Sequence, residues 1–251
     1  MIKIKLKTIP ALTLLITTLV LSFKANISHA DTDVTLKPYI LLGVIEGDLS
    51  TEGVESDFNV GWDEIGKLNG AVGVDLDIRK EDFNILTQAS FTILEDTEPT
   101  VQNQTYKDAR QDFESIFVTE TLGINLYNEE GDTFDLNFGG RFANVSNTLT
   151  LREGAGEREY SESDSWVDPV VGFYTSLQLG DACVFHLGGD YGGFDVGSKQ
   201  TWQALTALDF ALTQKAAFSV GYRALDHEYD KDGFKYDILM HGPTMGFQLN
   251  F

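Results

Sequence analysis

Long apolar runs are scarce in this sequence of 251 residues, and so is cysteine. After the first 30 residues no segment approaches 18 consecutive apolar residues, which excludes a transmembrane helix from that part of the chain. Cys183 is the single cysteine. An intramolecular disulfide and a thiolate metal site are therefore both excluded.

Basic residues are also few, because 18 lysines and arginines stand against 39 aspartates and glutamates. The formal net charge is −21. Nucleic acid is excluded as a partner, since its phosphates require lysine and arginine for neutralisation.

The first thirty residues carry an export pattern. Three lysines among the first seven residues precede the uncharged apolar stretch 11–23, and Ser28-His29-Ala30 then offers small residues at both positions that a signal peptidase reads. This order predicts a signal peptide over 1–30, cleaved between Ala30 and Asp31. The alternative, an N-terminal anchor helix, is disfavoured because the apolar stretch is short. One domain, 31–251, remains.

Apolar residues in this domain alternate with a period of two, which places successive side chains on opposite faces of a strand. In 202–212, for example, Trp202, Leu208 and Leu212 share one face, and Gln203 and Asp209 lie on the other. The pattern predicts ten strands, with eight to twelve possible: 34–45, 69–79, 83–94, 113–127, 133–146, 165–179, 182–191, 200–212, 216–226 and 234–251.

The connections between these strands differ in length. Short turns follow the second, fourth, sixth and eighth strands, and long polar loops follow the first, third and fifth, at about 46–68, 95–112 and 147–164. Short turns on one side and long loops on the other are typical of an outer-membrane β-barrel, and an even strand count leaves both termini in the periplasm.

A soluble β-sandwich shows the same period, so the choice depends on what the second face holds. A sheet crosses hydrocarbon only if it closes, with an apolar outer face and a lumen that tolerates charge. Here the second face is rich in glycine and carries charged residues: Asp75, Asp77, Arg141, Asp168, Asp190, Asp209 and Arg223. We therefore expect an all-β fold, a single antiparallel transmembrane barrel.

The end of the chain is the most specific signal. Met245, Phe247, Leu249 and Phe251 alternate up to the terminal carboxylate. This pattern resembles the C-terminal signal that the barrel-assembly machinery reads on outer-membrane substrates, so we expect that machinery to be a partner during insertion.

Three places do not fit regular strands. Glu120 has the parity of lipid-facing residues, which predicts a β-bulge that shifts the register. A second bulge is expected at His241-Gly242-Pro243, because proline lacks the N–H and parity changes between Met240 and Met245. Residues 58–68 suggest one or two helical turns.

From Ser165 onward, about the last third of the chain, the sequence resembles a family of small Gram-negative outer-membrane barrel proteins, mostly of unassigned function. The stretches that carry the resemblance are 166–172 (WVDPVVG), 189–198 (GDYGGFDVGS), 201–203 (TWQ), 221–226 (GYRALD), 236–237 (YD) and 241–243 (HGP). The N-terminal half resembles the family only in layout, including the acidic loop around 62–65. The resemblance implies the architecture and no assigned reaction.

The lumenal face offers a candidate site. We expect a charge network in which the two arginines pair with acids across the interior; its members are Arg141, Asp168, His186, Asp190, Asp209 and Arg223. Because a buried charge is retained only when paired, this network would stiffen and plug a narrow barrel. The alternative is a selective pore lined by the same groups, although the interior of a small barrel is largely filled by side chains.

Catalytic interpretations are weaker. Asp226-His227 together with Asp75 and Asp77 is similar to the paired groups of omptin-type outer-membrane proteases, but the predicted topology places the two pairs at opposite ends of the barrel. A Ser–His pair on one lipid-facing surface, as in lipid A deacylases, is not found, and His186 is expected to bond a lumenal carboxylate.

The expected function is therefore a non-catalytic outer-membrane barrel with a structural or surface role. A narrow channel for small solutes is the alternative, and a lipid A-modifying enzyme is a third. No cofactor is implied. Expected partners are outer-membrane lipid and lipopolysaccharide, with divalent cations at the acidic first loop, whose oxygen ligands suit Ca²⁺ or Mg²⁺ but match no closed calcium loop.

Overall fold

A computed structural model describes residues 32–61, 70–96, 100–101, 104–105, 109–153, 156–231 and 233–251. The predicted signal peptide, with its cleavage site at Ala30 and Asp31, lies outside these residues, as do residues 62–68 of the first predicted loop. No helix in the described ranges has the length and apolarity needed to cross a membrane.

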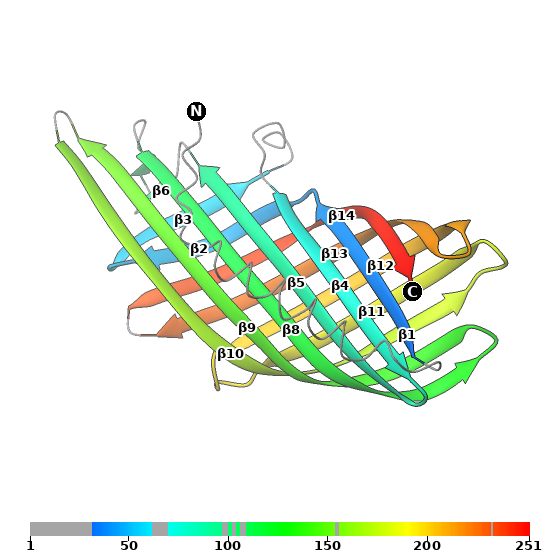
Figure 1. The fold of residues 1–251 in the computed structure, drawn as a ribbon. Coiled ribbons are helices and arrows are strands. Elements are labelled where there is room, and N and C mark those ends of the chain that lie inside the picture. Colours follow the sequence, from blue (N-terminus) through cyan, green and yellow to red (C-terminus); the bar gives the residue numbers. More distant parts are fainter. Residues whose placement is uncertain are drawn as a thin grey trace. The chain divides into compact units, whose positions relative to one another are not determined.

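Ten strands form a closed antiparallel barrel, as predicted (Figure 1). Their bounds are β1 Asp33–Leu41, β4 Gly70–Lys80, β5 Phe83–Asp96, β8 Ala109–Glu129, β9 Asp132–Glu153, β10 Gly156–Gln178, β11 Cys183–Gly193, β12 Gln200–Thr213, β13 Ala216–Lys231 and β14 Phe234–Asn250. Each strand pairs with the next in this order, and β14 pairs with β1 to close the sheet. Because the ring of ten strands is closed, each barrel strand has a paired neighbour on both sides over at least part of its length.

Four further strands extend the sheet at one end: β2 Val44–Thr51, β3 Val54–Val60, β6 Thr100–Val101 and β7 Gln104–Thr105. β2 continues β1 along β14, and β3 folds back on β2 and pairs with β6. The prediction of loops at 46–68, 95–112 and 147–164 was thus wrong over the following segments, which are strand: 46–51, 54–60, 95–96, 100–101, 104–105, 109–112, 147–153 and 156–164. Helical turns were likewise wrong for 58–60, which belong to β3.

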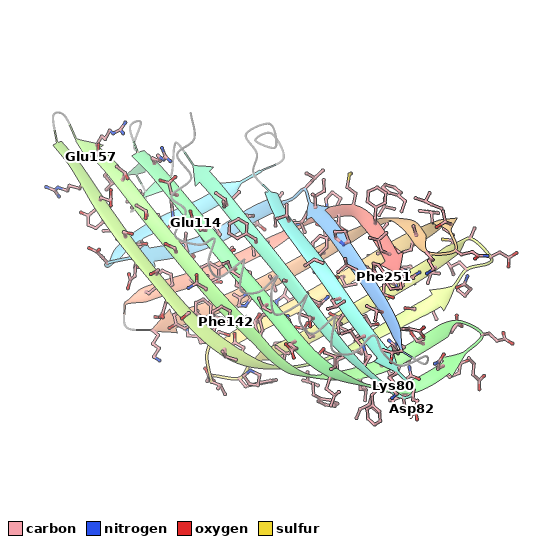
Figure 2. All side chains as sticks on the ribbon, in the orientation of Figure 1. Lys80, Asp82, Glu114, Phe142, Glu157 and Phe251 are labelled. Atoms are coloured by element: carbon pink, nitrogen blue, oxygen red, sulfur yellow. The ribbon has the colours of Figure 1, made fainter. Side chains whose placement is uncertain are left out.

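The opposite end of the barrel carries tight turns. Between β8 and β9, Glu130 and Gly131 have φ values of 54° and 90°, the left-handed conformation that a two-residue hairpin turn requires. The C-terminus lies at this end, because the Phe251 N–H donates to the Val34 carbonyl oxygen and the Asn250 N–H donates to that of Lys215. Figure 2 places Lys80 and Asp82 at this turn end and Glu157 at the far end.

The outer face carries a band of exposed apolar side chains near the turn end. Its members are drawn from every barrel strand and include Ile40, Val72, Ile85, Leu122, Phe138, Phe142, Val167, Leu187, Phe210 and Phe247. In β13 this band ends at the exposed ring of Tyr222, beyond which outward positions are Ala224, Asp226 and Glu228. The outer face therefore changes from apolar to acidic along the strand.

Glu120 is not at a bulge, contrary to prediction. It pairs in regular register with Thr87 on one side and Gly140 on the other, and its exposed side chain points outward within the apolar band. The register shift in β8 lies instead between Asn125 and Tyr127.

The second predicted bulge was also wrong. β14 runs in unbroken register against β13 through His241 to Pro243. Met240 is buried inside the barrel and Met245 is exposed outside, so their opposite parity needs no irregularity. The prediction failed because it assigned every apolar residue to the outer face.

Apolar side chains fill the interior of the barrel's far half. We call this cluster the apolar cap; its residues are Ile45, Leu49, Leu94, Phe113, Phe117, Ala143, Val145, Trp166, Leu225, Tyr229, Phe234, Tyr236, Ile238 and Met240. Trp166 and Tyr229 stack with ring centroids 4.0 Å apart. This packed core explains why β8, β9 and β10 continue as strands beyond the apolar outer band.

Candidate functional site in the polar interior

Arg141 occupies the interior directly below the apolar cap. Its guanidinium is fully buried and donates to Asp190 Oδ1 at 2.5 Å, to Thr201 Oγ1 at 2.7 Å and to Thr119 Oγ1 at 2.9 Å. Asp190 also accepts from the Gln203 amide at 3.4 Å. A buried guanidinium on β9 that bonds to β8, β11 and β12 ties separate walls of the barrel together.

A second layer lies closer to the turn end. Arg223 donates to both Asp75 oxygens and to the Tyr39 hydroxyl at 2.5 Å, with its guanidinium carbon 4.4 Å from the Tyr39 ring centroid. Tyr39 lies across Gly73, where an added Cβ would come within 2.3 Å of the ring. Glycine is required there because the aromatic ring takes the space of a side chain.

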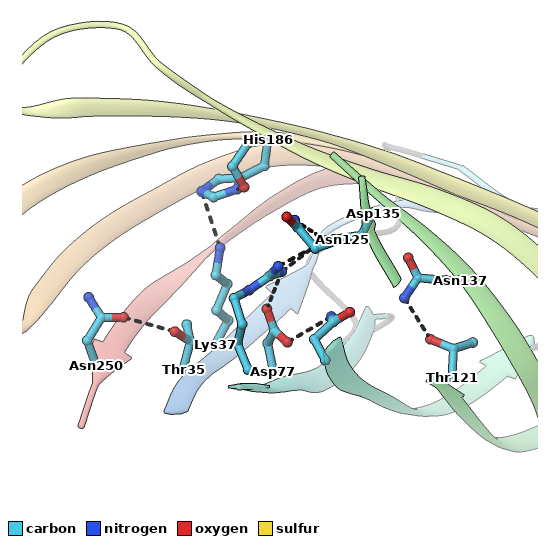
Figure 3. A network of polar contacts seen from close by, with 12 residues as sticks. Thr35, Lys37, Asp77, Thr121, Asn125, Asp135, Asn137, His186 and Asn250 are labelled. Carbon is cyan, nitrogen blue, oxygen red and sulfur yellow. Dashed lines mark hydrogen bonds and ion pairs between the residues drawn. The ribbon is translucent and has the colours of Figure 1, made fainter. Parts of the chain in front are cut away.

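Lys37 and His186 make the third layer, with Asp209 between them. His186 Nε2 lies 2.8 Å from Asp209 Oδ2, and Lys37 donates to the same oxygen at 3.1 Å. His186 Nδ1 lies 2.9 Å from Ser176 Oγ. Figure 3 shows Lys37 reaching toward His186 across the interior.

Arg79 forms the layer nearest the turns. It donates to Asp135 at 2.9 and 2.6 Å and to Asp77 at 3.3 Å. Asn84 donates to Asp77 and Asn125 donates to Asp135, so both carboxylates are bonded from two sides. Figure 3 shows Asn125 beside Asp135.

These three lower layers line a cavity of about 280 Å³. Its wall includes Asp75, Asp77, Arg79, Asp135 and Arg223, and it opens toward the turn end, where Gly131 and Gln248 also line it. The side chains above it at Arg141 and in the apolar cap are buried. The interior is therefore a polar vestibule at one end and a packed core at the other.

The structure brings part of the predicted network together. Arg141 pairs with Asp190, whereas Arg223 pairs with Asp75, and Asp209 pairs with Lys37 and His186. Asp168 has no arginine partner among the residues that the structure describes; it accepts from the Trp166 indole at 3.0 Å and from the Ser198 backbone N–H at 2.6 Å.

Sequence reasoning missed Lys37, Tyr39, Arg79 and Asp135 as members of this site. Their parity was a usable signal, because Lys37 and Tyr39 alternate with the outward Pro38 and Ile40. Which partner each charge takes depends on strands far apart in the sequence and is not readable from alternation.

The residues considered for catalysis are separated. Asp226 points outward and His227 points inward, where its ring stacks on Phe117 at 4.5 Å between centroids. Within the described residues neither nitrogen of this buried histidine has a hydrogen-bond partner. Asp75 lies two layers below, bonded to Arg223. The described residues also include no group of three or more His, Cys, Asp or Glu side chains placed to hold a metal ion.

The residues of the predicted assembly signal lie at the turn end, with Met245, Phe247 and Leu249 in β14 and Phe251 directly after it. Met245, Phe247 and Phe251 are exposed, and Phe247 packs edge-on against Phe218 with centroids 5.8 Å apart. Their recognition by assembly machinery stays a prediction.

Comparison with known proteins finds likeness in fold only. No family model matches the sequence, and no curated protein matches it. Among solved structures, the outer membrane protease OmpT from Escherichia coli is similar, with a TM-score of 0.58 and 9% identity over 89% of this chain and 98% of that one. The chain has the fold of an outer-membrane β-barrel.

Two further structures align less closely. A major outer membrane protein from Thermus thermophilus has a TM-score of 0.45 at 10% identity, covering 89% of this chain and 100% of that one. The translocator domain of the autotransporter NalP from Neisseria meningitidis has a TM-score of 0.44 at 10% identity, covering 97% of each chain.

Proposed function

We propose that this chain is a non-catalytic outer-membrane protein, a closed and plugged barrel that anchors an acidic strand extension at the cell surface. The outer apolar band supports insertion into lipid, because those exposed side chains on every barrel strand would otherwise face water. Export by a cleaved signal peptide at Ala30 and Asp31, and periplasmic placement of the turn end, are part of the same proposal.

The observation that carries the plugged barrel is the complete burial of Arg141 beneath the apolar cap. Hydrogen bonds to three other strands, β8, β11 and β12, hold its guanidinium in place, and the aromatic rings above it are buried as well. A solute entering the vestibule from the turn end would meet this layer and stop. Conduction would require the buried Arg141–Asp190 pair to open.

Planar-bilayer recording of the refolded chain tests this function. We expect no discrete openings at any applied voltage, with a general porin in the same bilayer as the positive control. Stepwise openings with a reproducible conductance would contradict the plug and favour the narrow-channel alternative.

The non-catalytic part needs a separate measurement. Mass spectra of lipopolysaccharide from cells with and without the protein should be identical. A new or missing lipid A species would support the third hypothesis, a lipid A-modifying enzyme.

Fractionation with heat-modifiable gel migration should place the folded protein in the outer membrane; recovery in periplasmic extract would overturn the localisation.

The surface role involves lipopolysaccharide as a partner. Acidic side chains cluster beyond the apolar band, for example Glu46, Asp48, Asp57, Asp226 and Glu228, and divalent cations would bridge them to lipid phosphates. Adding a chelator should weaken binding of the protein to lipopolysaccharide vesicles if this bridging operates.

A further inference from the structure

Among the described residues, the long strand β10 has an edge beyond the barrel with no strand paired to it. It pairs with β9 from Gly156 to Ser176, nearly its whole length, but pairs with β11 only from Val170 onward. In the described part of the chain no backbone hydrogen bond joins 156–168 to any strand other than β9. Figure 1 shows β9 and β10 projecting together beyond β11.

The lower part of this edge is covered by neighbouring segments, and the upper part carries side-chain contacts but no paired strand. Glu52, in the turn between β2 and β3, bonds the Ser161 N–H and Glu162, and the Tyr229 hydroxyl donates to Asp164. The loop after β11 reaches β10 at Asp168, where the Ser198 N–H bonds its carboxylate, and Trp166 is held under Tyr229. Above that point Ser161, Ser163 and Ser165 are exposed. In the described residues, the edge without a paired strand therefore runs from about Glu157 to Ser165.

Two backbone N–H groups at this edge are bonded by side-chain carboxylates and not by a paired strand. The Ser161 N–H donates to Glu52 Oε1 at 3.4 Å, and the Ser165 N–H donates to Oδ1 of the adjacent Asp164 at 2.7 Å. Because backbone direction alternates along a strand, Ser163 presents its N–H and C=O on the same side. Side-chain carboxylates stand where the carbonyls of a paired strand would stand.

This edge has one of the usual protections against pairing, the inward-pointing acids Glu162 and Asp164, and lacks several others. Natural edges are shielded by proline, lysine, bulges or covering segments, because an unpaired strand is a template for another chain. Between Glu159 and Ser165 there is no proline or lysine, the register against β9 is regular, and the outward side chains are three short serines. These short side chains leave room for an incoming strand.

We propose that the β10 edge from Glu157 to Ser165 docks an extended, cationic segment of another protein, which adds to the sheet as a strand. Charge selects the occupant: four acids flank the edge, Glu157, Glu159, Glu162 and Asp164, against Arg158 and the Arg152 of β9 that pairs with Glu157. A second copy of this chain would bring the same four acids and a net charge of −21, so self-pairing is disfavoured. The inference deepens the proposed surface role.

A labelled peptide of alternating lysine and threonine is the probe, titrated against the folded full chain in detergent micelles. Two matched peptides are the controls: one with glutamate for each lysine, and one with the same charges but N-methylated along one edge. Hydrogen exchange at Ser161, Ser163 and Ser165 is read in parallel.

We expect the lysine peptide to bind and to protect those amides, and both control peptides to fail. Ser163→Pro should weaken binding about tenfold, the loss of one or two net hydrogen bonds, because proline removes the edge donor without touching the β9 ladder. Ser163→Ala should bind as the parent does. A folded Ser163→Pro is verified by its heat-modifiable migration.

Several results would overturn the inference. Equal binding of the N-methylated peptide would mean charge attraction without strand pairing, and equal binding of the glutamate peptide would contradict the acidic selectivity. Absence of binding and amide protection would remove the site. Concentration-dependent dimers dispersed by Ser163→Pro would identify a second copy as the occupant instead. None of these outcomes depends on conductance, so failure of the plug would be recognised separately.

Discussion

Removing Arg141 tests whether the interior network stabilises the barrel. In Arg141→Met the guanidinium is lost and Asp190, whose side chain is 3% exposed, stays buried without its cation. Breaking a buried pair from one side costs about 3–5 kcal/mol, because a desolvated charge remains uncompensated. We expect the free energy of unfolding to fall by that amount, and the vestibule and apolar cap to keep their positions.

The double variant Arg141→Met, Asp190→Leu gives the sharper comparison. Replacing both partners by apolar groups is often near neutral, so most of the loss should be recovered. Arg152→Met is the matched control, since its partner Glu157 and Arg152 itself are more than half exposed, and such pairs contribute about 0–1 kcal/mol.

Urea-induced unfolding in lipid vesicles, followed by tryptophan fluorescence, measures these differences. A loss below about 1 kcal/mol in Arg141→Met would refute the reasoning, since a buried charge left alone must cost more than an exposed one. If the double variant lost as much free energy of unfolding as the two single variants together, the coupling between Arg141 and Asp190 would be refuted.

Three further outcomes follow from the structure. Trp166→Ala should lower the free energy of unfolding by about 3–5 kcal/mol, since it empties the stacked centre of the apolar cap; a loss like that of the outward Trp202→Ala would show that the cap is not packed. Glu120→Leu should raise stability in bilayers by about 1 kcal/mol, because its carboxylate faces outward within the apolar band; a destabilised variant would contradict that orientation. Asp57 lies in β3, outside the barrel wall, and desolvation together with the facing carboxylate of Asp48 raises its pKa. The β2–β3 hairpin should therefore become more stable as the pH falls through that raised pKa, and be less stable above it. Hydrogen exchange of 44–60, corrected for intrinsic rates, measures this, and Asp57→Asn should remove the pH dependence.

Alternation in the sequence was sufficient to predict the ten barrel strands and their connections at the turn end. The pairing of β10 with β11, for example, follows from two segments of period two joined by a tight turn at 179–182. Local pattern and short connections carry this information, because neighbouring antiparallel strands are also neighbours in the chain. Closure of β14 on β1 is then the remaining way to pair the two edges.

The partners of the lumenal charges depended on the closed barrel. Alternation places Arg223 inside, but whether it meets Asp75 or Asp209 depends on strand tilt and stagger around the whole circumference. Asp75 lies on β4 and Arg223 on β13, so no local spacing relates them.

By itself the sequence determined that strands alternate between two faces, and that one face carries the charges near the turn end. Only the tertiary structure decided which face is inside along each strand's whole length. If every apolar residue is assigned to the lipid-facing side, Met240 and Tyr236 are predicted to point outward, yet they lie in the apolar cap. The physical reason is that a period of two separates the two faces of a strand but does not say which face contacts lipid, water or the interior. Beyond the lipid, apolar side chains are buried only if they point into the barrel.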